Sequence, residues 1–295
     1  MPEHRLPAET SLGHVRIRVT DRARAESFYQ KVLGMTLCRS SDQEAAFDVR
    51  PDGSGIVVIE ATPGAEQGPR RATGLFHFAI LLPDRPSLAR AFRHLHAVGW
   101  QLQGASDHAV SEALYLADPD GNGIEIYCDR PRESWPQIGP ELQMTTERLD
   151  LASLLSEAPP SMDGSPWRMP PGTRLGHIHL RVSQLDAAER FYHGVLGFDI
   201  VTRAYPGALF MSAGGYHHHV AANVWAGVGA PRPPANATGL IDFSVVIPGD
   251  DALERVLDRI RSETSTEPQP VWIGGRAGWR VEDPDGNGVV LIPED

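Results

Sequence analysis

The phrase Asp-Pro-Asp-Gly-Asn-Gly occurs at residues 118–123 and again at residues 283–288. Other phrases recur in step with it. Leu-Gly-His begins at residues 12 and 175, and Thr-Gly-Leu begins at residues 73 and 238. The offset between the copies is 163 residues early and 165 residues later, so about two residues are inserted between these phrases. The chain is therefore a tandem duplication, and comparing its copies shows which polar residues one copy kept and the other lost.

The composition is that of an ordinary globular protein. The chain has 295 residues, 41% of them hydrophobic and 22% charged, which is long enough for two domains with their own cores. Its net charge of -11 argues against nucleic acid or an anionic membrane as a partner. Because we find neither an apolar span of about 18 residues nor a signal peptide, we expect a cytoplasmic protein. The sequence leaves the oligomeric state open and allows a homodimer.

The first unit of the chain has the pattern of a βαβββ motif. Residues 12–20 alternate between apolar and polar side chains, as a half-buried strand does. A helix follows, which Asp21 can cap and Gly34 can end. Short strands then run to about Glu60, the last of them rich in β-branched residues.

The second unit has the same order. It opens with a strand over residues 75–82, continues with a helix that ends at Gly99, and closes with two strands. The Asp-Gly and Asn-Gly pairs of the repeated phrase predict a tight hairpin between those two strands. Units three and four, at about residues 173–226 and 238–292, repeat this order.

The units group into two sequence halves. We predict an N-terminal domain of units one and two over residues 8–130 and a C-terminal domain of units three and four over residues 172–295. The proline-rich segment 131–171 between them is predicted to be a linker. It holds one short amphipathic stretch, residues 151–155, behind a helix-capping Asp150.

Three phrases together carry a family resemblance. Leu-Gly-His stands near the start of units one and three, Phe-Tyr-x-x-Val-Leu-Gly lies in the helix of the same units, and Asp-Pro-Asp-Gly-Asn-Gly-Ile-Glu stands at the end of unit two. Four such units resemble the vicinal oxygen chelate superfamily, which includes glyoxalase I, extradiol ring-cleaving dioxygenases, fosfomycin-resistance thiol transferases and bleomycin-binding proteins. The resemblance covers nearly the whole chain outside the linker. It implies an α+β fold whose units pair into two cupped mixed-sheet barrels, with a divalent metal on a concave face.

Comparing the copies locates a candidate metal site. Unit two has His77 in its first strand and Glu125 in its last, where unit four has Asp242 and Val290. A carboxylate between two isoleucines needs a partner, because burying it alone would be costly. Since both residues stand at family ligand positions, we predict that they bind a metal; the alternative is a buried hydrogen-bonded pair.

The third ligand is either His14 or His177, which occupy the same position in units one and three. If unit two pairs with unit one, the ligands would be His14, His77 and Glu125, with Glu60 resembling the fourth ligand of glyoxalase I. If unit two pairs across the linker with unit three, the ligands would be His177, His77 and Glu125.

We favour the crossed pairing, because it brings the histidine triplet of residues 217–219 into the same cleft. The triplet would lie on the adjacent final strand of unit three, and units one and four would form a structural half. The triplet resembles the His-His segment of extradiol dioxygenases, and this resemblance implies that His218 acts as acid and base.

Further residues fit ring cleavage by the same resemblance. Tyr115 lies at the spacing from Glu125 at which extradiol enzymes carry a substrate-binding tyrosine, and His108 lies near the position of another active-site histidine. Asn223, Trp225 and His219 are predicted to line the substrate pocket, although Tyr115 and Trp225 could equally be packing residues and His108 an exposed loop residue.

The resemblance implies a metal-dependent extradiol dioxygenase of the catechol 2,3-dioxygenase type. Its substrates would be a small aromatic diol and O₂, and its product a ring-opened semialdehyde. A site of two histidines and one carboxylate favours Fe(II), with Mn, Ni or Zn as other candidates. Two alternatives stay open: a glyoxalase I-like isomerase or lyase, and a metal-free protein that binds a small molecule.

Overall fold

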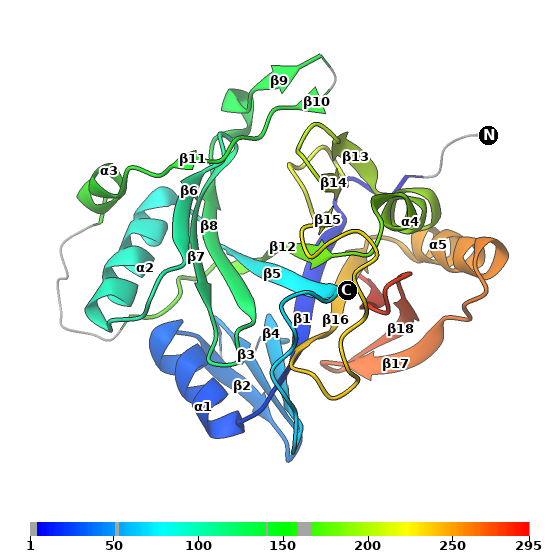
Figure 1. Cartoon of the computed structure of the whole chain (residues 1–295), viewed down its shortest axis with the longest axis horizontal. Helices are drawn as coiled ribbons and strands as arrows, with labels where there is room; N and C mark the ends of the chain where they lie inside the picture. Colours follow the sequence, from blue (N-terminus) through cyan, green and yellow to red (C-terminus); the bar gives the residue numbers. More distant parts are fainter. Residues whose placement is uncertain (1–4, 51–52, 140, 159–166, 295) are drawn as a thin grey trace.

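The computed structural model describes residues 5–50, 53–139, 141–158 and 167–294. Its strands form two large curled sheets, one of eight strands and one of nine, with a small two-stranded sheet beside them (Figure 1). Four βαβββ units build the two large sheets, so the predicted fold class is confirmed. None of the described helices is both long and apolar enough to cross a lipid bilayer.

Units one and four share the eight-stranded sheet. Unit one consists of β1 (Ser11–Val19), α1 (Arg22–Ser27), the π-helix η1 (Phe28–Val32), β2 (Thr36–Ser40), β3 (Glu44–Asp48) and β4 (Val57–Ala61). Unit four consists of β16 (Gly239–Ile247), α5 (Asp250–Glu263), β17 (Gln269–Ile273), β18 (Arg276–Glu282) and β19 (Gly288–Pro293). The strand order is β17-β18-β19-β16-β1-β4-β3-β2, and β1 pairs with β16 antiparallel.

Units two and three share the nine-stranded sheet. Unit two consists of β5 (Gly74–Leu81), α2 (Arg85–Ala97), β6 (Gly104–Asp107), β7 (Ser111–Ala117) and β8 (Gly123–Asp129). Unit three consists of β12 (Arg174–Arg181), α4 (Leu185–Glu189), the π-helix η3 (Arg190–Leu196), β13 (Asp199–Thr202), β14 (Ala208–Ser212) and β15 (Val220–Asn223). Antiparallel pairing of β5 with β12 joins them, so the crossed pairing is confirmed, and each sequence half contributes one unit to each sheet (Figure 1).

The segment between the halves is more than a spacer. It forms η2 (Arg132–Ser134), β9 (Gln137–Ile138), β10 (Glu141–Leu142), β11 (Glu147–Arg148) and α3 (Leu151–Ser156). Strand β11 pairs with β6 at the edge of the nine-stranded sheet, and α3 packs against α2. The predicted helix cap is confirmed, because the Asp150 carboxylate accepts a hydrogen bond from the Ser153 backbone N–H. Pro140 and residues 159–166 of this segment lie outside the described residues.

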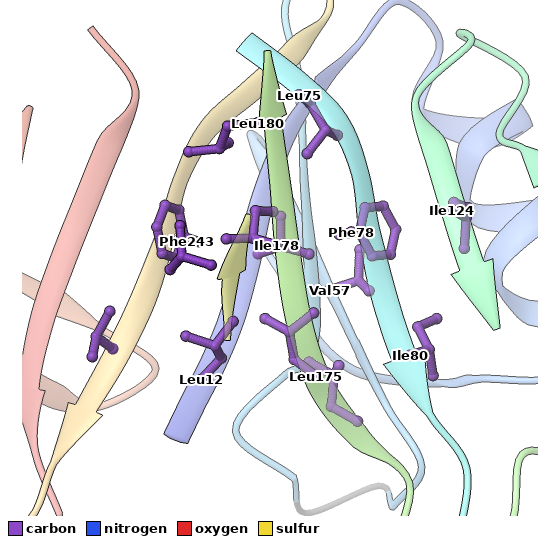
Figure 2. Packing of buried hydrophobic residues seen from close by; sticks show 14 of the residues in the cluster. Leu12, Val57, Leu75, Phe78, Ile80, Ile124, Leu175, Ile178, Leu180 and Phe243 are labelled. Carbon is purple, nitrogen blue, oxygen red and sulfur yellow. The ribbon is translucent and has the colours of Figure 1, made fainter. Parts of the chain in front are cut away.

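The two sheets pack against each other through their middle strands. Strand β1 lies against β12, and β16 lies against β5. Figure 2 shows the buried side chains between them, among which Phe78, Ile178 and Phe243 are fully buried. Because successive residues of a strand point to opposite faces, the neighbours His77 and His177 face away from this core. The core thus fixes which face of the nine-stranded sheet carries the polar residues.

The repeated Asp-Pro-Asp-Gly-Asn-Gly phrase forms the predicted hairpin turns and also ties the sheets together. In the first copy the Asp118 carboxylate accepts hydrogen bonds from the backbone N–H groups of Asp120 and Asn122. The Tyr29 hydroxyl, from unit one in the other sheet, donates to the same carboxylate at 3.3 Å. In the second copy Tyr192 donates to Asp283 at 3.0 Å. Each turn therefore links two consecutive units that lie in different sheets.

Two sequence predictions are corrected. The single helix predicted after Asp21 is a short α-helix followed by a π-helix, and unit three repeats this change. Phe28 and Tyr29, the first two residues of this π-helix, are both buried. The histidine triplet does not lie on a strand: it follows the turn at Gly214 and Gly215 and stands immediately before β15. The positive φ values of these two glycines allow the chain reversal that precedes the triplet, of which His218 lines the cavity described below.

Candidate metal centre

Strands β5, β8 and β12 bring His77, Glu125 and His177 together. The three residues are buried, and one ligand atom from each lies within 4.8 Å of the others. The Glu125 Oε2 atom is 3.0 Å from His77 Nε2 and 3.1 Å from His177 Nε2. Their positions follow from strand register, since Ala79 pairs with both Glu125 and His177 and so places the two side chains on either side of β5.

The hydrogen bonding of this group is incomplete, which fits a site built for a cation. His77 Nε2 is buried and has no hydrogen-bond partner among the described residues, although it lies close to the carboxylate. His177 Nδ1 is also buried without a partner in the described chain. Native proteins rarely leave such buried atoms unpaired without a functional reason.

The charges of the group also fit a cation. Burial alone would raise the pKa of Glu125, but the His177 and His77 imidazoles hold it well below its usual value. Burial lowers the pKa of His177 to about 4, although Glu125 acts in the opposite direction. Near neutral pH the group therefore combines a carboxylate with a neutral His177, and these are donors that a divalent metal accepts.

A second group of potential ligands lies beside the first. His177, His217 and His218 also bring one ligand atom each within 4.8 Å of the others. Both ring nitrogens of His217 are already engaged, however, Nε2 with Asp129 at 2.9 Å and Nδ1 with His218 at 2.8 Å. The group with Glu125 is therefore the better candidate, because it offers a negative charge and free nitrogen atoms.

A cavity of about 350 Å³ opens next to this group. Several residues predicted from the sequence line it, namely His77, Glu125, Tyr115, His108, His218 and Trp225. Asn223 is fully buried outside the lining and contacts the ring of His179, with Nδ2 and Nε2 2.9 Å apart. His219 lines a different cavity, where its Nδ1 accepts a hydrogen bond from the Ala213 N–H. The structure thus does not bring Asn223 and His219 to the cavity wall.

The predicted pair Tyr115 and His108 forms a hydrogen-bonded unit. The His108 Nε2 atom lies 2.7 Å from the Tyr115 hydroxyl, and its Nδ1 lies 2.6 Å from the carbonyl oxygen of Thr145. Because a carbonyl can only accept, Nδ1 carries the proton and Nε2 accepts from the tyrosine. Burial and the nearby Glu125 raise the pKa of Tyr115 well above its usual value, so its hydroxyl stays protonated.

Sequence reasoning missed His179. This residue lies two positions after His177 on β12, faces the same cavity, and has its ring 5.0 Å from that of His77. Burial and the neighbouring His77 and His177 lower the pKa of His179 well below its usual value. Two signals could have found it: the alternation of His177 and His179 along one strand, and the arginine, Arg16, at the matching position of unit one.

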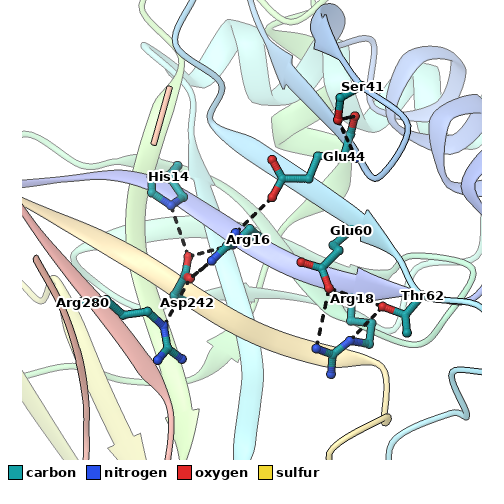
Figure 3. Close-up of polar contacts among 9 residues, drawn as sticks. All are labelled: His14, Arg16, Arg18, Ser41, Glu44, Glu60, Thr62, Asp242 and Arg280. Carbon is teal, nitrogen blue, oxygen red and sulfur yellow. Dashed lines mark hydrogen bonds and ion pairs between the residues drawn. The ribbon is translucent and has the colours of Figure 1, made fainter. Parts of the chain in front are cut away.

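The eight-stranded sheet carries an ion-pair cluster where its partner carries the candidate metal site. Asp242, which matches His77, is fully buried and bonded to the Arg16 guanidinium (Figure 3). His14 Nε2 lies 3.3 Å from the same carboxylate, and Arg280 Nε lies 3.7 Å from it. The charge of Arg16 thus neutralises the buried Asp242 carboxylate.

The ligand set expected for a glyoxalase I-like site is not assembled. His14 is on β1 and bonds to Asp242, whereas His77 and Glu125 lie in the other sheet. Glu60 pairs with Arg18 at 3.7 Å on the eight-stranded sheet (Figure 3). The four residues therefore do not share one site.

Paired βαβββ units of this kind form the vicinal oxygen chelate fold, and the His-Glu-His group beside the cavity is a candidate metal centre. A family model, the Glyoxalase/Bleomycin resistance protein/Dioxygenase superfamily, matches residues 11–126 and 174–291. The chain belongs to this superfamily.

Known proteins similar to this chain include a catechol-2,3-dioxygenase of Bacillus subtilis (strain 168). The two are 45% identical over 258 residues, which cover 86% of this chain and 88% of the relative. Among solved structures, a candidate dioxygenase of Bacillus subtilis subsp. subtilis str. 168 matches with a TM-score of 0.66 and 13% identity over 96% of this chain and 84% of that chain. Glyoxalase I from Zea mays matches with a TM-score of 0.60 and 17% identity over 97% of this chain and 92% of that chain. At these identities the two structures support the fold alone.

Proposed function

We propose that this chain is an extradiol dioxygenase that opens the ring of a catechol-type diol with O₂. One observation carries the proposal: His77, Glu125 and His177 form a buried group beside a cavity that also exposes His218 and Tyr115. The 45% identical relative, a catechol-2,3-dioxygenase, supports the same reaction. Both atoms of O₂ would enter the product, a ring-opened semialdehyde.

The ligands of the metal in this proposal are His77, Glu125 and His177. Two histidines and one carboxylate are the donor set of non-haem Fe(II) oxygenases, so Fe(II) is the metal that we propose. When bound, such a metal supplies Lewis acidity toward the diol and a place where the diol and O₂ meet.

Two protein groups have the chemistry to assist at the diol. His218 lines the cavity, and burial together with the nearby His177 and His217 lowers its pKa well below the usual value. A neutral imidazole can accept the proton that a diol hydroxyl gives up and return it later. Tyr115 is protonated and donates to His108, so its oxygen keeps lone pairs that can accept a hydrogen bond from the diol.

The cavity wall indicates which ring substituents fit. Much of the wall is apolar, and none of the residues that line it in the described chain is lysine or arginine; the apolar side chains are Phe76, Val110, Leu116, Ile124, Met144, Phe210 and Trp225. A substituent with a negative charge would lose its hydration there without gaining a cationic partner. We therefore propose diols with neutral, apolar substituents as the substrates.

Oxygen uptake tests this proposal. Protein that is reconstituted anaerobically with Fe(II) is expected to consume one O₂ per ring when it is mixed with catechol or 4-methylcatechol, as a yellow semialdehyde forms. For 3,4-dihydroxybenzoate, kcat/KM should be lower by ~10-fold or more, because its carboxylate enters an apolar pocket.

The same assay separates the alternatives. Isomerisation of a hemithioacetal without oxygen uptake would favour a glyoxalase-like enzyme. Tight binding of an aromatic ligand with no turnover by the Fe(II)-loaded protein would favour a binding protein. Either result would contradict the dioxygenase proposal, and equal kcat/KM for the charged diol would contradict the substrate class alone.

A further inference from the structure

A chain of hydrogen bonds runs from the cavity to a carboxylate behind it. His218 lines the cavity, and its Nδ1 atom lies 2.8 Å from Nδ1 of His217. The other ring nitrogen of His217, Nε2, lies 2.9 Å from Oδ1 of Asp129. Asp129 is the last residue of β8, the strand that carries Glu125, so this arrangement is fixed to the same strand as the candidate metal centre.

The direction of each hydrogen bond follows from the carboxylate. An ionised carboxylate only accepts, so Nε2 of His217 must carry the proton that lies between them. With this one proton on its ring, His217 has a lone pair at Nδ1, so the hydrogen bond between the two rings is donated by Nδ1 of His218. The Nε2 atom of His218 is left with a lone pair, and no other hydrogen bond of this ring is found in the described residues.

The neighbours of Asp129 support the same direction. The Tyr216 hydroxyl also donates to Oδ1 of Asp129, at 3.1 Å. Because that hydroxyl has a single proton, the Tyr127 hydroxyl, 2.7 Å away, must donate to Tyr216. His217 and Tyr216 therefore both donate hydrogen bonds to Asp129, and Tyr127 donates to Tyr216. His217 is completely buried, so water does not compete for its nitrogens.

We propose that Asp129 and His217 are positioning residues that fix the tautomer of His218, with the proton on Nδ1 and the free base at Nε2. The role of His218 as the base rests on the proposed dioxygenase function. In that role the O–H bond of a diol hydroxyl breaks and an N–H bond forms at Nε2 of His218. Without Asp129 the His217 ring has no fixed tautomer, and His218 would present an N–H to the cavity in part of the molecules.

The tautomers can be read directly, without activity. Long-range ¹H–¹⁵N correlation spectra of the full chain, labelled with ¹⁵N-histidine and without added metal, distinguish a protonated Nδ1 from a protonated Nε2. The signals are assigned by their loss in His217→Asn and His218→Asn. We expect His218 protonated at Nδ1 and His217 at Nε2 in the wild-type protein. A His218 protonated at Nε2 would overturn the proposal, whatever reaction the enzyme performs.

Kinetics test whether the tautomer matters. In the Fe(II)-loaded enzyme, Asp129→Asn is expected to keep the metal and a KM within about threefold of wild type, while kcat falls by ~10-fold to ~10²-fold. The matched control is Tyr216→Phe, which removes a hydrogen bond from the same carboxylate but leaves His217 in place, and its kcat should stay within about threefold. If the role of Asp129 were purely structural, kcat would fall by a similar factor in both variants.

The outcomes separate this inference from the proposed function. If wild type takes up no O₂ with any diol, the dioxygenase proposal fails while the spectra still decide the tautomers. If the spectra agree but Asp129→Asn keeps full kcat, the positioning role is wrong. If Asp129→Asn or His217→Asn loses the metal, the ion is bound by His177, His217 and His218 instead, which also overturns the inference.

Discussion

Replacing Glu125 with glutamine is expected to remove the metal and all measurable turnover, and to make the metal-free protein less stable than wild type near neutral pH. Glu125 is the one carboxylate in the His77, Glu125 and His177 group, and without it the remaining donors are imidazoles. Within the part of the chain that the structure describes, its buried carboxylate forms ion pairs with the two histidines alone. Losing that charge therefore costs the metal site its affinity. Because the pKa of Glu125 lies well below its usual value, the metal-free fold also loses the stabilisation that the two imidazoles give the carboxylate.

The matched control lies at the corresponding place in the other sheet. Asp242→Asn is expected to keep the metal and to destabilise the fold by ~1–3 kcal/mol, because the Arg16 guanidinium loses its buried partner. Metal content by plasma mass spectrometry and thermal unfolding of metal-free samples measure both effects. Wild-type metal content in Glu125→Gln, or loss of metal in Asp242→Asn, would contradict the assignment of the site to the nine-stranded sheet.

His218→Ala is expected to show the opposite pattern, with full metal content and a kcat lower by ~10²-fold or more. The reason is that His218 faces the cavity beside His177, their ring centroids 4.0 Å apart, but its Nδ1 is engaged by His217 and it is not needed as a ligand. Activity lost in this way reflects a missing acid and base rather than a missing metal.

Steady-state oxygen uptake and metal analysis of the same samples make this measurement. His96→Ala, which removes an exposed histidine of α2, is the control and should behave as wild type. Loss of the metal in His218→Ala would indicate that His218 is a metal ligand. An unchanged kcat would show that His218 has no role in the reaction.

The pairing of units could be predicted because the duplication allows equivalent positions of the units to be compared. His14 and His177 occupy equivalent positions of units one and three. The crossed pairing places His177, and not His14, in one cleft with His77, Glu125 and the histidine triplet, and for this reason the sequence favours it. The topology confirms that pairing. Strand alternation then determines which face each residue occupies, so the three candidate ligands could be predicted without knowledge of any distance.

The rest of the site depends on tertiary contacts that leave no local pattern. The Thr145 carbonyl that orients His108 comes from the segment between the halves, which the sequence predicted to be a linker with one short amphipathic stretch. The partnership of Asp129 with His217 joins residues 88 positions apart. The position of Asn223 after the triplet predicts a pocket residue. At the end of β15, however, its side chain contacts the ring of His179. Alternation along a strand predicts the face of the sheet on which a side chain lies. The hydrogen-bond partners of His108, His217 and Asn223 depend instead on how separate elements pack.

Metal content after removal of one histidine tests the central claim most directly. His177→Ala and His14→Ala alter equivalent positions of units three and one, so both proteins can be loaded with Fe(II) anaerobically and analysed side by side. We expect His177→Ala to lose the metal and the oxygen uptake, because His77 and Glu125 alone cannot hold it in a defined geometry. His14→Ala should retain about one metal per chain. If His14→Ala lost the metal while His177→Ala kept it, the metal site would not lie between units two and three.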